Sequence, residues 1–233
     1  MYKRIVLLSI VAALFAGCQT SPTPSDMDRM EDVEAPEQVQ ATLTNTVEET
    51  TQAEPSVAAE EPQEQERNTV MILMKTSKGD IKIELDPEKA PKTVASFLSY
   101  VEADHYNGTV FHRVMNGFMI QGGGFDADME QKPAPRTVEN EASNGLKNIV
   151  GSIAMARTPD PHSASAQFFI NVDDNTFLDY PGQDGWGYCV FGQVVEGMDV
   201  VDAIKAVPTG NKGPHQNVPT DPVTINEVSV IGE

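Results

Sequence analysis

One arginine lies among apolar and amide side chains in two short runs of the sequence, residues 111–124 and residues 166–172. Together the two runs carry Arg113, Phe118, Met119, Gln121, Gln167 and Phe169. A guanidinium and two amides, set among aromatic and thioether groups, would bind an apolar ring and orient a peptide beside it. We therefore expect a peptide-binding pocket that contains a cation.

Short strands and two helices are the elements that would position these residues. Residues 71–75 and 81–85 flank a glycine-containing turn and predict a β-hairpin. Pro91 opens a segment with apolar residues three and four apart, which predicts a helix ending near residues 106–108. A second helix is expected at residues 198–207, ended by Pro208. Six further strands are expected at residues 110–114, 118–121, 151–156, 167–172, 188–194 and 223–231.

These eight short strands predict a mainly β fold. The pattern is typical of a closed eight-stranded antiparallel β-barrel capped by two α-helices, because closure leaves no strand edge unpaired. Cys189 falls inside one expected strand, so we expect a small buried hydrophobic residue there. A reactive thiol is the weaker interpretation, because no basic neighbour is present to activate it.

Residues 1–17 have the features of a bacterial lipoprotein signal peptide. Lys3 and Arg4 precede an apolar run, which is too short to span a bilayer and is followed by small residues and Cys18. Residues 14–18 resemble a lipobox, with Phe15 where leucine is usual, so we expect Cys18 to be lipidated and to anchor the chain to a membrane. The alternative is an ordinary signal peptide with a chance cysteine.

Residues 18–69 are expected to form an acidic, disordered linker. From Gln19 to Asn68 the chain has 13 acidic residues against two arginines, a net charge of minus 11, and no aromatic residue. Such a segment cannot bury a core. The whole chain has a formal net charge of −19, which argues against nucleic acid as a partner because phosphate contacts need clustered lysine and arginine. The absence of a long heptad pattern favours a monomer.

Six motifs follow one another along the remaining sequence. They are Phe111-His-Arg-Val, Phe118-Met-Ile-Gln-Gly, Met155-Ala-Arg157, Gln167-Phe-Phe-Ile-Asn171, Phe177-Leu178 and Val190-Phe-Gly192. In order and approximate spacing they resemble the cyclophilins, a family of peptidyl-prolyl cis/trans isomerases, and the likeness covers residues 70–233. Residues 157–167 and 185–189 are similar to the shorter bacterial members. The resemblance implies an eight-stranded barrel with two capping helices, and proline-containing polypeptides as substrates.

The resemblance also implies a role for each matching residue. Arg113 corresponds to the family's catalytic arginine, and Gln121 and Gln167 correspond to residues that orient it or bind the substrate backbone. The proline pocket is then formed by Phe118, Met119, Phe169 and Leu178.

Other matching positions would contact the rest of the substrate. Ala156 and Arg157 correspond to contacts with the residues before the proline, and an exposed Arg157 would favour acidic or polar residues there. Phe177 and Tyr188 stand where many eukaryotic members have tryptophan and histidine. We therefore expect weak binding of the drug cyclosporin, with activity retained.

Such a site suits rotation about an X-Pro bond. Rotation breaks amide resonance, against a barrier of about 18–20 kcal/mol, and leaves the prolyl nitrogen basic in the transition state. A guanidinium aimed at that nitrogen donates a stronger hydrogen bond in the transition state than in the planar ground state, which is the differential binding that catalysis requires. Arg113 would therefore act with no cofactor, no metal and no proton transfer.

Three functions stay open from the sequence. The first is an isomerase for exported proteins in the bacterial envelope, where Gln19 after Cys18 resembles sorting to the outer membrane, facing the periplasm. The second is a non-catalytic chaperone or scaffold that holds proline-containing segments in the same groove. The third makes the acidic linker the functional part and the domain a spacer.

Overall fold

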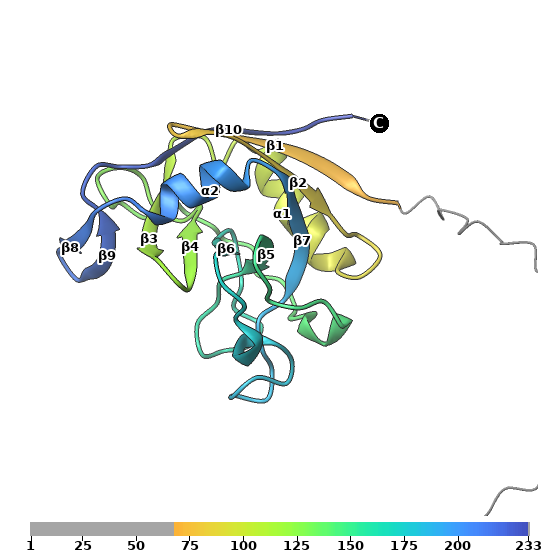
Figure 1. The fold of residues 1–233 in the computed structure, drawn as a ribbon. Coiled ribbons are helices and arrows are strands. Elements are labelled where there is room, and N and C mark those ends of the chain that lie inside the picture. The colour runs from red at the N-terminus through yellow and green to blue at the C-terminus, as the bar shows by residue number, and fades with distance from the viewer. Residues whose placement is uncertain (1–67, 233) are drawn as a thin grey trace, which may run out of the picture. The chain divides into compact units, whose positions relative to one another are not determined.

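The computed structural model describes residues 68–232 (Figure 1). The expected signal peptide, Cys18 and nearly all of the expected linker lie outside these residues. The strands are β1 (Val70–Thr76), β2 (Gly79–Leu85), β3 (Thr109–Met115), β4 (Met119–Gly122), β5 (Ser152–Met155), β6 (Phe168–Asn171), β7 (Val190–Glu196), β8 (Thr209–Lys212), β9 (His215–Pro219) and β10 (Thr224–Val230). The helices are α1 (Pro91–Glu102) and α2 (Met198–Lys205), with short 3-10 helices η1 (Ala142–Asn144) and η2 (Thr176–Leu178).

Eight strands close a barrel in the order β1-β10-β3-β4-β6-β5-β7-β2, and all neighbouring pairs are antiparallel. The predicted eight-stranded antiparallel barrel with two helices is therefore confirmed. β8 and β9 form a separate hairpin, which Figure 1 shows beside β3. The sequence reasoning missed this hairpin, because all of β8 is exposed and has no alternation of apolar and polar residues.

Aromatic side chains fill the barrel interior. Phe111 and Phe168 are fully buried, and their rings meet edge to face with centroids 6.2 Å apart. Phe97 of α1 stacks on Tyr106 at 4.9 Å and reaches Phe168 at 6.0 Å. α1 is thus fixed to the barrel by its apolar face, and this cluster supports β3 and β6 from the inside.

The start and the end of α1 have separate causes. Pro91 opens the helix, where a missing N–H costs nothing, and the Thr93 amide donates to the Glu141 carboxylate at 2.8 Å. The helix ends at Glu102, short of the predicted end near residues 106–108. Asp104 has a positive φ of 51°, which breaks the helical path and turns the following chain into the core.

Cys189 is buried and free, as predicted, but it lies immediately before β7 rather than inside a strand, because the pairing of β5 with β7 begins at Val190. Burial raises the pKa of its thiol to about 11. Among residues 68–232, no helix is long and apolar enough to cross a membrane. The same part of the chain contains no group of three or more His, Cys, Asp or Glu side chains that could hold a metal ion.

Candidate active site

The pairing of β3, β4 and β6 brings the arginine and the two glutamines together. Arg113 of β3 lies opposite Gln121 of β4, and Gln121 lies opposite Phe169 of β6. Arg113 Nη1 donates to Gln121 Oε1 at 3.4 Å, and Gln121 Nε2 donates to Gln167 Oε1 at 3.0 Å. The guanidinium carbon lies 5.8 Å from the centroid of the Phe118 ring. A chain of two amides thus orients the cation from one side.

An apolar pocket lies beside this arginine, with a volume of about 110 Å³. Its lining residues are Arg113, Phe118, Met119, Gln121, Ala156, Arg157, Phe169, Leu178 and Tyr188. Met119, Phe169 and Leu178 are buried within a second apolar cluster, outside the main core. The volume is well below that of pockets for drug-sized ligands, so the pocket suits one small ring. Two arginines and no carboxylate line it.

Two predicted site residues lie beside this lining rather than in it. Gln167 reaches the pocket through its hydrogen bond with Gln121. Phe177 stacks on Phe118 with ring centroids 5.8 Å apart and stays 50% exposed. The structure therefore brings all eleven predicted site residues into one region, nine of them in the pocket itself. Trp186, the only tryptophan in the chain, packs against His162 at 4.9 Å, as a loop residue.

The sequence predicted an exposed cationic side chain at Arg157, and this prediction is wrong. The side chain is only 2% exposed and lies over the Tyr188 ring at 4.4 Å. Nε and Nη2 donate to the Gly187 carbonyl at 3.1 and 3.0 Å, and Nη1 donates to the Thr158 carbonyl at 3.0 Å. Nη2 also pairs with Asp184 and lowers the pKa of that carboxyl to about 2. Arg157 therefore fastens a loop and orients Tyr188, and it presents no free charge to a substrate.

A buried polar network supports the pocket from behind. Asn148 donates to Asp179 through its backbone amide, at 2.7 Å, and through Nδ2, at 3.1 Å. Asn171 Nδ2 donates to Asn148 Oδ1 at 3.2 Å, and Asn175 Nδ2 donates to Asn171 Oδ1 at 2.7 Å and to the Phe118 carbonyl at 2.8 Å. The network links the residue before β4 and the end of β6 to the two residues that flank η2. Sequence reasoning missed these residues, although Asn171 ends one of the motifs that it used.

His112, next to Arg113 in β3, is buried against an aromatic ring. It is 5% exposed, its ring lies 4.7 Å from Phe125, and its Nδ1 has no hydrogen-bond partner within the described residues. Burial lowers the pKa of His112 to about 4, so the imidazole is neutral at pH 7. A neutral imidazole beside Arg113 adds no competing charge to the site.

The fold and the pocket together define a closed barrel protein with a pocket of the size of one small ring beside a cation. The family model "Cyclophilin type peptidyl-prolyl cis-trans isomerase/CLD" matches residues 71–230. The chain is 57% identical over 162 residues to "Peptidyl-prolyl cis-trans isomerase B" of Escherichia coli, covering 69% of this chain and 99% of that protein. It is 56% identical over 163 residues to "Peptidyl-prolyl cis-trans isomerase cyp18" of Streptomyces antibioticus, covering 69% and 98%.

Solved structures share the fold. A cyclophilin-type isomerase of Cryptosporidium parvum has a TM-score of 0.58 at 24% identity, covering 71% of this chain and 99% of that one. The cyclophilin AquaCyp293 of Hirschia baltica has a TM-score of 0.56 at 26% identity, covering 69% and 75%. The chain belongs to the cyclophilin family. It is a peptidyl-prolyl cis-trans isomerase.

Proposed function

We propose that the domain accelerates X-Pro isomerisation in the folding of exported proteins, and that Arg113 is its catalytic residue. The observation that carries this proposal is one guanidinium, oriented by Gln121 and Gln167, at the edge of a small apolar pocket. A donor that is already oriented needs little reorganisation when charge develops on the substrate.

In the proposed mechanism, the apolar side chains of the pocket hold the proline ring and Arg113 acts on the prolyl nitrogen. The pyrrolidine ring packs against Met119, Phe169 and Leu178, whose side chains are buried. Arg113 donates to the prolyl nitrogen as it becomes pyramidal and basic, and the low local dielectric strengthens this hydrogen bond. The bond is weaker in the planar cis and trans ground states, so Arg113 lowers the barrier in both directions.

The test is exchange spectroscopy by NMR on a proline peptide, with catalytic amounts of the purified protein. We expect Arg113→Ala to lower kcat/KM by about 10²–10³-fold, the usual cost of losing one charge-stabilising donor. Arg136→Ala is the matched control, because Arg136 stacks on Tyr100 and lines none of the pocket. Unchanged exchange in Arg113→Ala would refute the catalytic role of Arg113. Peptide binding without faster exchange in the wild type would instead indicate a peptide-holding module.

We further propose that Cys18 is lipidated and anchors the protein to the outer membrane, facing the periplasm, with residues 18–69 as the linker. The support is the lipobox-like sequence at residues 14–18 and the acidic composition that follows. Mass spectrometry of the N-terminal peptide from membrane fractions would detect the acyl chains. Loss of membrane association in Cys18→Ser is the expected result, and unmodified N-terminal peptide in the wild type would contradict the anchor.

A further inference from the structure

A second hollow adjoins the proline pocket and shares Leu178 and Tyr188 with it. Its lining residues are Phe177, Leu178, Gly182, Gln183, Asp184, Gly187 and Tyr188. Its volume is about 210 Å³, larger than that of the proline pocket. A polypeptide whose proline occupies the first pocket would therefore have neighbouring residues within reach of this hollow.

The loop that forms the hollow is held in one shape. Gly187 has a φ of +67°, and a Cβ there would lie 2.7 Å from the Tyr180 nitrogen, so the backbone closes tightly on itself. Asp184 Oδ1 accepts the amides of Trp186 and Gly187 at 3.0 and 3.1 Å. Arg157, which follows the end of β5, donates to the Gly187 carbonyl and so joins the loop to that strand. The hollow is therefore formed before any ligand arrives, which lowers the entropic cost of binding.

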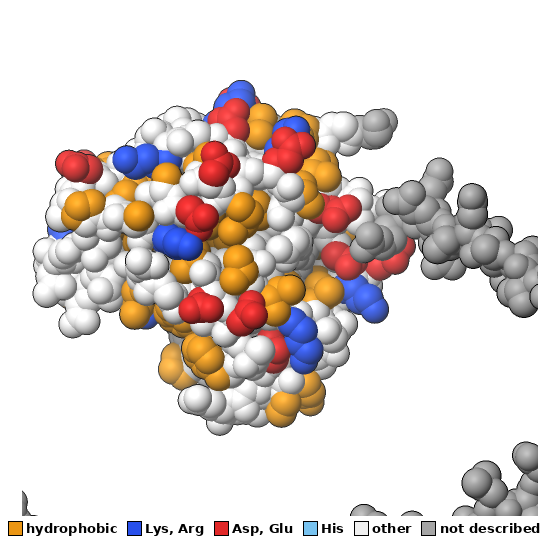
Figure 2. Space-filling model, viewed as in Figure 1, with side chains coloured by type: hydrophobic (Ala, Val, Ile, Leu, Met, Phe, Trp, Pro, Cys, Tyr) orange, Lys and Arg blue, Asp and Glu red, His pale blue; other side chains and the backbone are white. Residues whose placement is uncertain are grey.

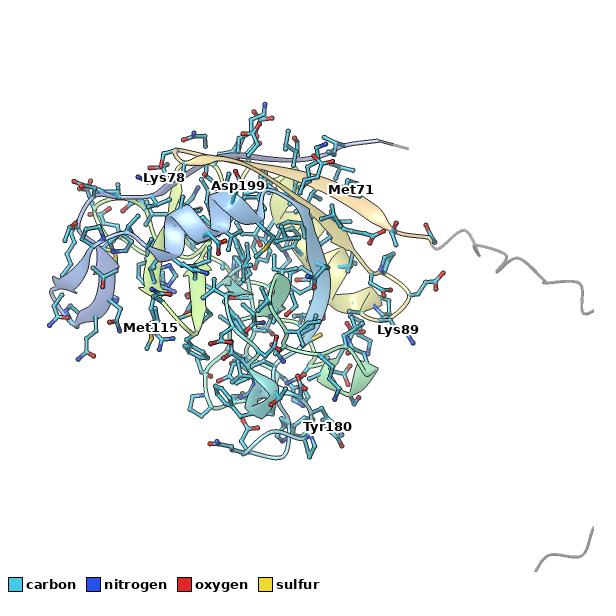
Figure 3. The ribbon with its side chains drawn as sticks, viewed as in Figure 1. Met71, Lys78, Lys89, Met115, Tyr180 and Asp199 are labelled. Carbon is cyan, nitrogen blue, oxygen red and sulfur yellow. The ribbon has the colours of Figure 1, made fainter. Side chains whose placement is uncertain are left out.

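Exposed aromatic side chains gather in the same segment of the chain. Among residues 68–232, the exposed aromatic residues are Phe177 at 50%, Tyr180 at 50% and Trp186 at 42%. Tyr180 lies at the lower end of the described residues in Figure 3, and Figure 2 shows hydrophobic side chains at that end of the same residues. Of these three residues, Phe177 lines the hollow itself. An exposed aromatic residue beside a binding site is typical of an interaction surface.

A third hollow flanks the proline pocket on the other side, and its chemistry is different. It shares Arg113 and Gln121 with the pocket, and polar side chains of the β8–β9 hairpin, including Gln216 and Asn217, line it. An apolar side chain would leave these amides unpaired. The hollow next to Phe177 has two polar side chains: Asp184, with which Arg157 already pairs, and Gln183, which is exposed to solvent. An apolar group is thus favoured on the Phe177 side.

We propose that the hollow next to Phe177 is a second subsite, which holds an aromatic or large aliphatic side chain of the polypeptide whose proline lies in the pocket. This inference rests on the proposed function and adds a substrate preference to it. The enzyme selects prolines that have a bulky apolar residue nearby. Such segments become buried when a protein folds, so they are exposed to the enzyme only in unfolded chains.

The test uses two sets of proline peptides and the purified protein. One set carries phenylalanine at each of the first four positions on either side of the proline, and the other carries serine at the same positions. We expect one position at which phenylalanine raises kcat/KM about tenfold over serine, mainly through KM, because burial of about 60 Å² of apolar surface corresponds to a tenfold change.

Two substitutions of exposed glutamines locate the effect. Gln183→Trp fills the hollow and should bring the phenylalanine-to-serine ratio close to one. Gln216→Trp makes the same change on the polar side and should keep the ratio near ten. The ratio is measured within each variant, so a general change of activity cancels. Nuclear Overhauser contacts between the phenylalanine ring and the Gly182 and Gln183 protons would give the position directly.

The outcomes separate the two proposals. If the wild type isomerises every peptide but shows no preference for phenylalanine at any position, the subsite is refuted and the isomerase proposal stands. A preference that survives Gln183→Trp, or ring contacts at Gln216 and Asn217 instead, would also refute the subsite. If no peptide shows faster exchange, the proposed function itself fails.

Discussion

Replacing Arg157 with alanine should lower the free energy of unfolding by about 3 kcal/mol. The three hydrogen bonds to the Gly187 and Thr158 carbonyls contribute about 0.7 kcal/mol each, and the stacking on Tyr188 adds about 1 kcal/mol. The pair with Asp184 adds little, because that side chain is 45% exposed. The Gly187 carbonyl keeps a bond from Asn140 Nδ2 at 3.1 Å, so the substitution leaves it paired.

Urea denaturation followed by two probes would measure this cost. Far-UV circular dichroism reports the barrel, and fluorescence reports Trp186, the only tryptophan, which lies in the loop that Arg157 holds. The melting temperature should fall by roughly 6–12 °C. Arg157→Lys keeps the charge but loses the planar fork, so its cost should be intermediate. Arg136→Ala removes one long hydrogen bond to Ser99, 3.4 Å, and a stack on Tyr100, and should cost about 1 kcal/mol.

Arg157→Ala should also raise KM for proline peptides several-fold, because Tyr188 loses the group that orients it at the pocket edge. A fluorescence transition that precedes the circular dichroism transition would indicate local opening of the loop. If Arg157→Ala costs less than about 1 kcal/mol and leaves KM unchanged, the reasoning from these hydrogen bonds is wrong.

Three other predictions concern His112, Cys189 and the two residues Phe177 and Tyr188. Burial lowers the pKa of His112 to about 4, so between pH 6.5 and 4 the unfolded chain binds more protons than the folded chain. The free energy of unfolding should therefore fall by about 3 kcal/mol as the pH drops through this window. Urea titrations should show a flatter pH dependence for His112→Gln, and an unchanged slope would contradict the assignment. Burial raises the pKa of Cys189, so iodoacetamide at pH 8 should label it only after unfolding, as mass spectrometry would detect. Cyclosporin should bind weakly, because Phe177 and Tyr188 stand where many eukaryotic cyclophilins have tryptophan and histidine. Inhibition at low nanomolar concentration would contradict the prediction of weak binding.

The barrel and most of the pocket could be predicted from the sequence because both follow from local patterns. Alternation along β6 separates Phe168, which faces the core, from Phe169, which faces the pocket. In β3, a register shift between Phe111 and Arg113 lets Phe111 face the core while Arg113 faces the pocket. The antiparallel register then places Arg113 opposite Gln121. The remaining pocket residues were predicted from the order of the motifs along the sequence. One of them is Leu178, which lies in the short 3-10 helix η2 and lines the pocket.

Features that depend on loops could not be predicted in the same way. The burial of Arg157 requires the chain to fold back so that Gly187 and Asp184 reach it, and neither residue is marked by periodicity. The β8–β9 hairpin is exposed and polar, so its pairing leaves no hydrophobic signal. The end of α1 depends on a positive φ at Asp104, a residue type that also occurs within helices.

The two sides of the pocket are held by different kinds of interaction. Asn148 and Asn171 are fully buried, so losing any member of their network leaves a partner unpaired, at a cost of about 1–3 kcal/mol for each group. The loop next to Phe177 is held by the buried Arg157 side chain, which bonds to the Gly187 carbonyl and pairs with Asp184 of the same loop. Both sides are therefore formed before a substrate binds, one through buried amides and the other through a buried guanidinium. Preformed walls on both sides lower the entropic cost of binding a proline together with its neighbour.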